Sequence, residues 1–319
     1  MTVAHLNSKQ FQIGDTRNLA HLNDGSLENH LKLFILTCRV NNLSPRTVND
    51  YAQKIGTFVS FLEQEGITAP AEITATYVRL FLLGAQQRCK PVSVHDYYGT
   101  INRFFNWLVE EEILKESPMS RMHPPKVPKE LIKPFKSQDI DDLLALCQNN
   151  FLGIRNRAII LTFLDTGLRL SELASIQLAD MDLDREIIKV MGKGAKERMV
   201  RIGRETQKAI LKYLLQRNDN LPCLWVTEER QPMKWNGIQI MIIRLGKRAG
   251  LSGVRCSPHT FRHSFATMAL KRGANVFYVQ ALLGHSTLIQ TRKYAATIDS
   301  EDAVKHHKDF SPVDRLGLK

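Results

Sequence analysis

The sequence has few cysteines, and their arrangement suggests neither a cross-link nor a metal site. The chain has 319 residues but only five cysteines, which are scattered and include no CxxC pair. An odd and dispersed set excludes a disulfide framework and a cysteine-based zinc site. We therefore expect reduced thiols and a cytoplasmic protein.

Long apolar runs and targeting signals are also missing. No apolar stretch approaches the ~18 residues needed to span a bilayer, and the N-terminus lacks a basic segment followed by an apolar one. A Gly-Lys-Gly occurs at 192–194, but the GxxxxGK[ST] pattern of a nucleotide-binding loop is absent. We expect a soluble protein with no membrane partner, no bound nucleotide, no metal and no other cofactor.

The first part of the chain carries no net charge, whereas the rest is strongly basic. Residues 1–125 contain 12 Lys and Arg and 12 Asp and Glu. The other 32 basic and 20 acidic residues lie in residues 126–319. The whole net charge of +12 therefore falls in the second part. Such a distribution favours a polyanionic partner such as DNA, although a merely soluble basic surface has the same composition.

Apolar periodicity predicts a mainly α protein with a small β-hairpin in its C-terminal domain. Helical spacing recurs in about four stretches between residues 26 and 116, which we interpret as a helical bundle after a flexible leader at 1–25. Residues 117–136 contain five prolines and five Lys or Arg, and predict a linker. A second domain at 137–298 and a polar tail at 299–319 complete the chain.

The side chains with the most chemistry are concentrated near the C-terminus. Ser257-Pro258 is a helix start signal, and Gly273 and Gly284 are placed where two helices should end. Five residues of interest lie within fewer than forty positions: His259, Arg262, His263, His285 and Tyr294.

This set of residue types is suited to attack on a phosphodiester. Arginine grips a phosphate through two hydrogen bonds, and histidine donates to phosphate oxygens or moves protons near neutral pH. Tyrosine acts as a nucleophile when cations or a base lower its pKa from ~10. Each residue alone has a structural alternative: Arg262 and His263 as a solvated face, or Tyr294 as a half-buried core residue.

Two more candidates lie earlier in the chain. Gly167 breaks a helix and leaves Arg169 at the junction, where Glu172 either orients it or serves the first turn of the next helix. Two β-branched runs flank Lys193 and predict a hairpin with this lysine at its tip. Lys193 there can donate a proton or be an exposed turn residue, and Lys196 and Arg198 are rival candidates.

Four ordered motifs make the chain resemble the tyrosine recombinases of the phage integrase family. Their spacing is more specific than any one of them, and the resemblance covers roughly residues 26–298. The motifs are TGLRLSEL at 166–173, VMGKGAKER at 190–198, HTFRHSFAT at 259–267 and LGHSTLIQTRKY at 283–294.

The resemblance implies a role for six residues in DNA cleavage. By this resemblance, Arg169 and Arg262 clamp the scissile phosphate, and His259 and His285 support it. Lys193 protonates the departing 5′ oxygen, and Tyr294 attacks phosphorus. The 3′-phosphotyrosyl bond keeps the phosphodiester's energy, so rejoining needs neither ATP nor a metal.

The resemblance also implies a two-domain clamp on double-stranded DNA and a homo-tetramer on paired sites, with tails exchanged between protomers. The short leader favours the simpler Xer-like or transposon type, while Ala295-Ala296 replaces the Thr-His of many relatives. Two other functions fit part of the pattern. One is relaxation of supercoiled DNA by a type IB topoisomerase, and the other is a non-catalytic DNA-binding regulator.

Overall fold

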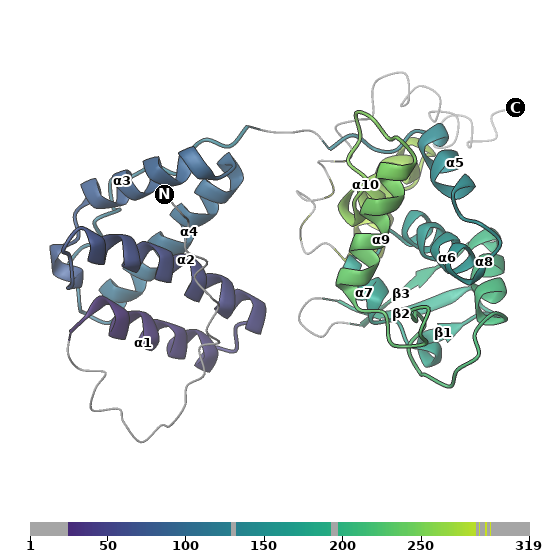
Figure 1. The fold of residues 1–319 in the computed structure, drawn as a ribbon, viewed down its shortest axis with the longest axis horizontal. Helices are drawn as coiled ribbons and strands as arrows, with labels where there is room; N and C mark the ends of the chain where they lie inside the picture. The colour runs from purple at the N-terminus through teal and green to yellow at the C-terminus, as the bar shows by residue number, and fades with distance from the viewer. Residues whose placement is uncertain are drawn as a thin grey trace, which may run out of the picture. The chain divides into compact units, whose positions relative to one another are not determined.

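The computed structural model describes residues 25–128, 132–192 and 197–284, together with Thr287, Thr291 and Tyr294. The predicted leader at 1–25 lies almost entirely outside these ranges, and the predicted tail at 299–319 lies wholly outside them. Contacts divide the chain into two compact units, 1–130 and 131–319 (Figure 1).

The first unit is a helical bundle. Its α-helices are α1 Leu27–Val40, α2 Pro45–Gln64, α3 Ala75–Arg88 and α4 Pro91–Glu110, with a short 3₁₀ turn, η2 Pro70–Glu72. Ser26 and Ser44 cap α1 and α2 by accepting backbone hydrogen bonds, and proline opens α2 and α4. Leu62, Ile101 and Phe104 are completely buried in its core.

The second unit packs helices against a small sheet (Figure 1). Its helical elements are α5 Ser137–Ala145, α6 Phe151–Thr166, α7 Leu170–Ala174, η3 Leu178–Asp180, α8 Arg204–Leu214, α9 Trp235–Arg248, α10 Pro258–Lys271 and α11 Val276–Leu283. Helix α6 packs against α8, α10 and strand β3, so the apolar centre of α6 lies in the middle of this core.

The predicted hairpin is present and belongs to an antiparallel sheet with the order β1-β2-β3 among the described residues. The strands are β1 Met181–Asp182, β2 Ile187–Met191 and β3 Glu197–Arg201. Ile188 pairs with Val200 and Val190 with Arg198, so alternate side chains of β2 enter the core. This arrangement confirms the predicted fold class.

Two local predictions differ from the structure. Leu224-Trp225-Val226 is a short apolar run that by itself favours a strand, but within it only Val226 forms a bridge, to Pro232, and Trp225 is completely buried. The apolar run therefore reflects a core position rather than sheet pairing. Glycine often ends a helix, and Gly84 therefore favours a helix end near that position, but Gly84 lies inside α3 because the next strong stop signal is Pro91.

Both ends of the predicted linker pack into the units they join. Met119 is buried in the first unit, where Tyr98 donates to the carbonyl of Met122 at 2.6 Å. Phe135 is buried in the second unit, and its N–H donates to Ser264 Oγ at 2.8 Å. The ordered contacts therefore extend further into 117–136 than its proline content indicates.

Candidate active site

A glycine that ends α6 sets the position of Arg169. Gly167 donates its N–H to the carbonyl of Phe163 at 3.0 Å and has a φ of +60°. A Cβ atom here would overlap the side chains of Phe265 and Leu283. Because only glycine avoids both penalties, the chain turns sharply and presents Arg169 at the start of α7.

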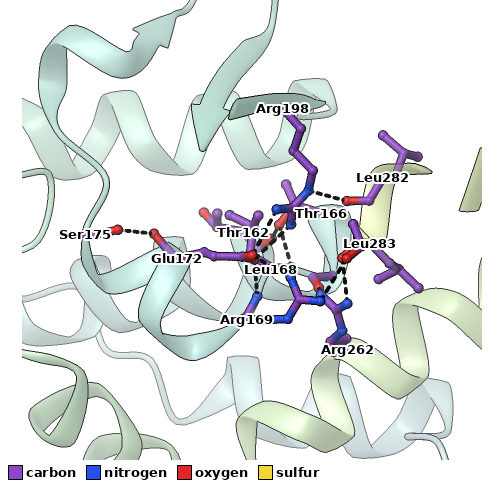
Figure 2. A network of polar contacts seen from close by, with 12 residues as sticks. Thr162, Thr166, Leu168, Arg169, Glu172, Ser175, Arg198, Arg262, Leu282 and Leu283 are labelled. Carbon is purple, nitrogen blue, oxygen red and sulfur yellow. Dashed lines mark hydrogen bonds and ion pairs between the residues drawn. The ribbon is translucent and has the colours of Figure 1, made fainter. Parts of the chain in front are cut away.

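Glu172 is the anionic centre of the site (Figure 2). It accepts from the backbone N–H of Arg169 at 2.8 Å and from Arg169 Nη1 at 2.7 Å. Arg198 donates to both carboxylate oxygens, from Nη1 at 2.9 Å and from Nη2 at 2.8 Å. Glu172 thus fulfils both roles weighed for it: it caps the first turn of α7 and orients Arg169.

Three arginines hold the C-terminal end of α11. Arg198 Nε donates to the carbonyl of Leu282 at 2.9 Å, and Arg262 Nη2 to that of Leu283 at 2.6 Å. Arg169 Nη2 donates to the carbonyl of Gly284 at 3.0 Å. The last carbonyls of a helix lack partners within it and carry partial negative charge. These cations therefore satisfy the helix end and converge because they share it.

Arg262 reaches this point from the middle of α10 and is only 6% exposed. Its Nη1 also donates to the carbonyl of Gly167 at 2.8 Å, so it links the ends of α6 and α11. Burial, followed by the charge of Arg169, lowers the pKa of Arg262 to about 10, while Tyr294 and Glu172 act in the opposite direction. At neutral pH the guanidinium of Arg262 therefore remains cationic.

Tyr294 lies within electrostatic range of Arg262. It packs against a small apolar cluster formed by α10 and α11, which includes Ala266 and Leu283. Its ring contacts that of His263, with 5.1 Å between the ring centroids, and its charge contributes to the pKa of Arg262. Tyr294 is half-buried, and 6% exposure of Arg262 and 8% of His263 rule out the solvated face considered for those two residues.

Of the remaining predicted residues, His259 alone lies in the described part of the chain, and it makes no contact with this network there. His259 lies in the first turn of α10, one turn before Arg262, and its side chain is exposed. Lys193 and His285 lie outside the described residues. The structure therefore brings together Arg169, Arg262 and Tyr294.

Arg198 is a residue whose role the sequence left open. It was a rival to Lys193 as proton donor, but the side chain is 13% exposed and donates to Glu172 and Leu282. Guanidinium does not lose a proton in proteins, so Arg198 organises its neighbours rather than donating a proton. The register of the hairpin was the available signal, because Arg198 pairs with the inward-facing Val190.

This arrangement is suited to binding an anion. Two guanidinium groups face one helix end, and each uses two of its five N–H groups in the contacts named above, leaving donors for a phosphate. Among the described residues, no three His, Cys, Asp or Glu side chains gather in a way that would hold a metal ion. Within the same ranges, every helix is too short or too polar to cross a bilayer.

The ionisation of Glu172 should be visible in the stability of the second unit. Burial tends to raise its pKa, but hydrogen bonds from Arg198 and Arg169 outweigh this and lower the pKa to about 2. Because the unfolded-state pKa is ~4.3, the stabilisation is complete above that value and is lost as the pH falls towards 2. We expect a loss of about 3 kcal/mol over this interval.

Urea unfolding of the wild type and of Glu172→Gln, at pH 7 and near pH 3, checks this expectation. A Trp107→Phe background leaves Trp225 and Trp235, both in the second unit, as the fluorescent reporters. At pH 7 the Gln variant should have a lower free energy of unfolding than the wild type. Its stability should also fall less steeply as the pH is lowered. Equal pH dependence in the two proteins would mean that Glu172 is not held ionised by the arginines.

Comparisons with known proteins match both parts of the chain. The model of the phage integrase family matches residues 133–301, and that of the phage integrase N-terminal SAM-like domain matches residues 30–115. A tyrosine recombinase XerC of Halalkalibacterium halodurans is 34% identical over 265 residues, covering 79% of this chain and 87% of the relative. The XerC of Haemophilus influenzae is 33% identical over 256 residues, covering 79% and 86%.

Solved structures show the same fold. A lambda integrase dimer bound to a COC′ core site has a TM-score of 0.72 at 17% identity, covering 84% of this chain and 95% of the other. The Tn1549 transposon integrase in complex with a circular intermediate DNA has a TM-score of 0.71 at 18% identity, covering 88% and 98%. With a family model matching over half its length and relatives above 30% identity along most of both chains, this chain belongs to the phage integrase family of tyrosine recombinases.

Proposed function

We propose that this chain is a site-specific recombinase that cleaves and rejoins double-stranded DNA through a 3′-phosphotyrosyl intermediate. The observation that carries the proposal is the meeting of Arg169 and Arg262 at the end of α11, with Tyr294 in electrostatic reach of Arg262. The relatives named tyrosine recombinase, and fold neighbours solved on DNA, support it.

In the proposed mechanism, the two arginines bind the non-bridging oxygens of the scissile phosphate. Negative charge on those oxygens is stabilised by donors fixed before the reaction begins. Tyr294 attacks phosphorus, Lys193 protonates the departing 5′ oxygen, and His259 and His285 donate hydrogen bonds and move protons. Rejoining is the reverse reaction.

The proposal extends to the assembly. We expect residues 26–116 and 137–298 to bind opposite sides of a duplex, and four protomers to act on paired sites, with the tail at 299–319 exchanged between them. The basic second part of the chain supports a DNA partner. Since its substrate is intracellular DNA, we expect the protein to work in the cytoplasm.

Trapping the covalent intermediate tests the proposal. The wild-type chain is incubated with genomic DNA fragments, the mixture is denatured in detergent, and the DNA ends that remain attached to protein are sequenced. We expect attachment through 3′ ends at one recurring sequence, and joined products only when two copies of that sequence are supplied. Relaxation of any supercoiled plasmid without a second site would favour a topoisomerase, and binding without attachment would favour a regulator.

A further inference from the structure

His263 occupies a buried position that packing alone does not explain. It follows Arg262 on α10, is 8% exposed, and its ring contacts the ring of Tyr294 at 5.1 Å between centroids. Its Nε2 atom is buried and has no hydrogen-bond partner among the described residues. An unsatisfied buried nitrogen destabilises a fold, so phenylalanine would suit this site better if contact with Tyr294 were its whole purpose.

The surroundings of His263 favour a neutral ring with a free lone pair. Burial lowers its pKa, and a hydrogen bond to the backbone of Ile132 acts in the opposite direction. Since Nε2 has no partner, the ring engages Ile132 through Nδ1, and a neutral imidazole that donates from Nδ1 leaves Nε2 as an acceptor. An acceptor therefore lies beside the predicted nucleophile, which carries a hydroxyl donor.

Building on the proposed function, we propose that His263 is a positioning residue for Tyr294. The imidazole supports the phenol ring, and Nε2 accepts a hydrogen bond from the phenol hydroxyl once DNA occupies the site. The hydroxyl is thereby aimed at the phosphorus held by Arg262, the neighbouring residue on α10. The six residues assigned roles by the family resemblance do not include His263.

Two substitutions separate the contribution of the aromatic ring of His263 from that of its Nε2 acceptor. His263→Phe keeps an aromatic ring against Tyr294 but removes the acceptor, and single-turnover adduct formation should slow on the order of 10-fold. His263→Ala removes both and should slow it on the order of 100-fold, the effect expected of a misplaced nucleophile. DNA affinity should be unchanged in both.

Thr267→Val is the matched control. Thr267 lies one turn later on α10, is 2% exposed, and its hydroxyl also lacks a partner among the described residues. Removing that hydroxyl should leave adduct formation at the wild-type rate. Thermal melts of all variants show whether any lost activity is lost folding.

A fluorinated tyrosine at position 294 supplies a readout that a purely structural role would not change. Several ring fluorines lower the phenol pKa from its usual ~10. At an assay pH above the lowered pKa, the nucleophile is ionised and has no hydroxyl to donate to Nε2. The ratio of the adduct-formation rates of the wild type and His263→Phe should then fall towards one. The inference would be overturned by a wild-type rate in His263→Phe, or by a rate ratio that fluorotyrosine leaves unchanged. A wild-type chain that forms no adduct would instead defeat the proposed function, and this inference with it.

Discussion

Tyr294→Phe is expected to lose the covalent protein–DNA adduct completely while DNA binding is retained. The substitution removes one oxygen atom and leaves the ring that packs on the α10–α11 cluster and on His263. No other group in the proposed mechanism forms a bond to phosphorus, so no residual adduct should remain. The measurement is a single-turnover assay with labelled duplex and detergent denaturation, beside a gel-shift titration of the same DNA.

Tyr278→Phe is the control for this experiment. Tyr278 lies on α11 and is 71% exposed, so its hydroxyl has no place in the buried network. It should form adduct at the wild-type rate. An adduct that persists in Tyr294→Phe would show that another side chain is the nucleophile. Such a result matters because Tyr294 is half-buried, as a purely structural tyrosine would also be.

Arg262→Ala is expected to slow cleavage by at least 10²–10³-fold, the usual cost of losing one preorganised donor to a developing oxyanion. Its loss also leaves the carbonyls of Gly167 and Leu283 without their donor in a buried place. Each unsatisfied buried group costs roughly 1–3 kcal/mol, so the variant should melt earlier as well. DNA binding should weaken but persist, because many phosphate contacts share the affinity.

Arg262→Lys and Arg185→Ala separate chemistry from folding and from net charge. Lysine keeps a cation but cannot donate in two fixed directions, so cleavage should remain strongly impaired in a better-folded protein. Arg185 is 80% exposed, and its removal changes the net charge equally. The Arg185→Ala variant should cleave DNA at nearly the wild-type rate. Wild-type cleavage rates in Arg262→Lys would refute the clamp role of the guanidinium.

The ends of the helices that carry the site could be predicted because their signals are local. Ser257 caps α10 by accepting from Thr260 N, Pro258 opens the helix, and Gly284 ends α11 with a φ of +62°. Gly167 behaves in the same way before Arg169. Such signals depend on the conformational preferences of single residues, which a sequence displays directly.

The pairing of distant residues could not be predicted in this way. Arg198 and Glu172 lie 26 positions apart, and nothing local in the sequence shows that these two side chains meet. Likewise, the burial of His263 depends on how α10 packs in three dimensions. Strand β1 has two residues, too few to show an alternating pattern. The roles of Lys193, His259 and His285 stay predictions from the family resemblance.

Anchoring three cations to successive carbonyls of one helix makes their geometry interdependent. A small slide or tilt of α11 changes the aim of Arg169 and Arg262 together, and Arg198 transmits the same movement to the β-hairpin. The donors proposed to bind the phosphate are therefore positioned, or displaced, together rather than one at a time. Core substitutions in α11, such as at Val279, should therefore disable cleavage without touching DNA.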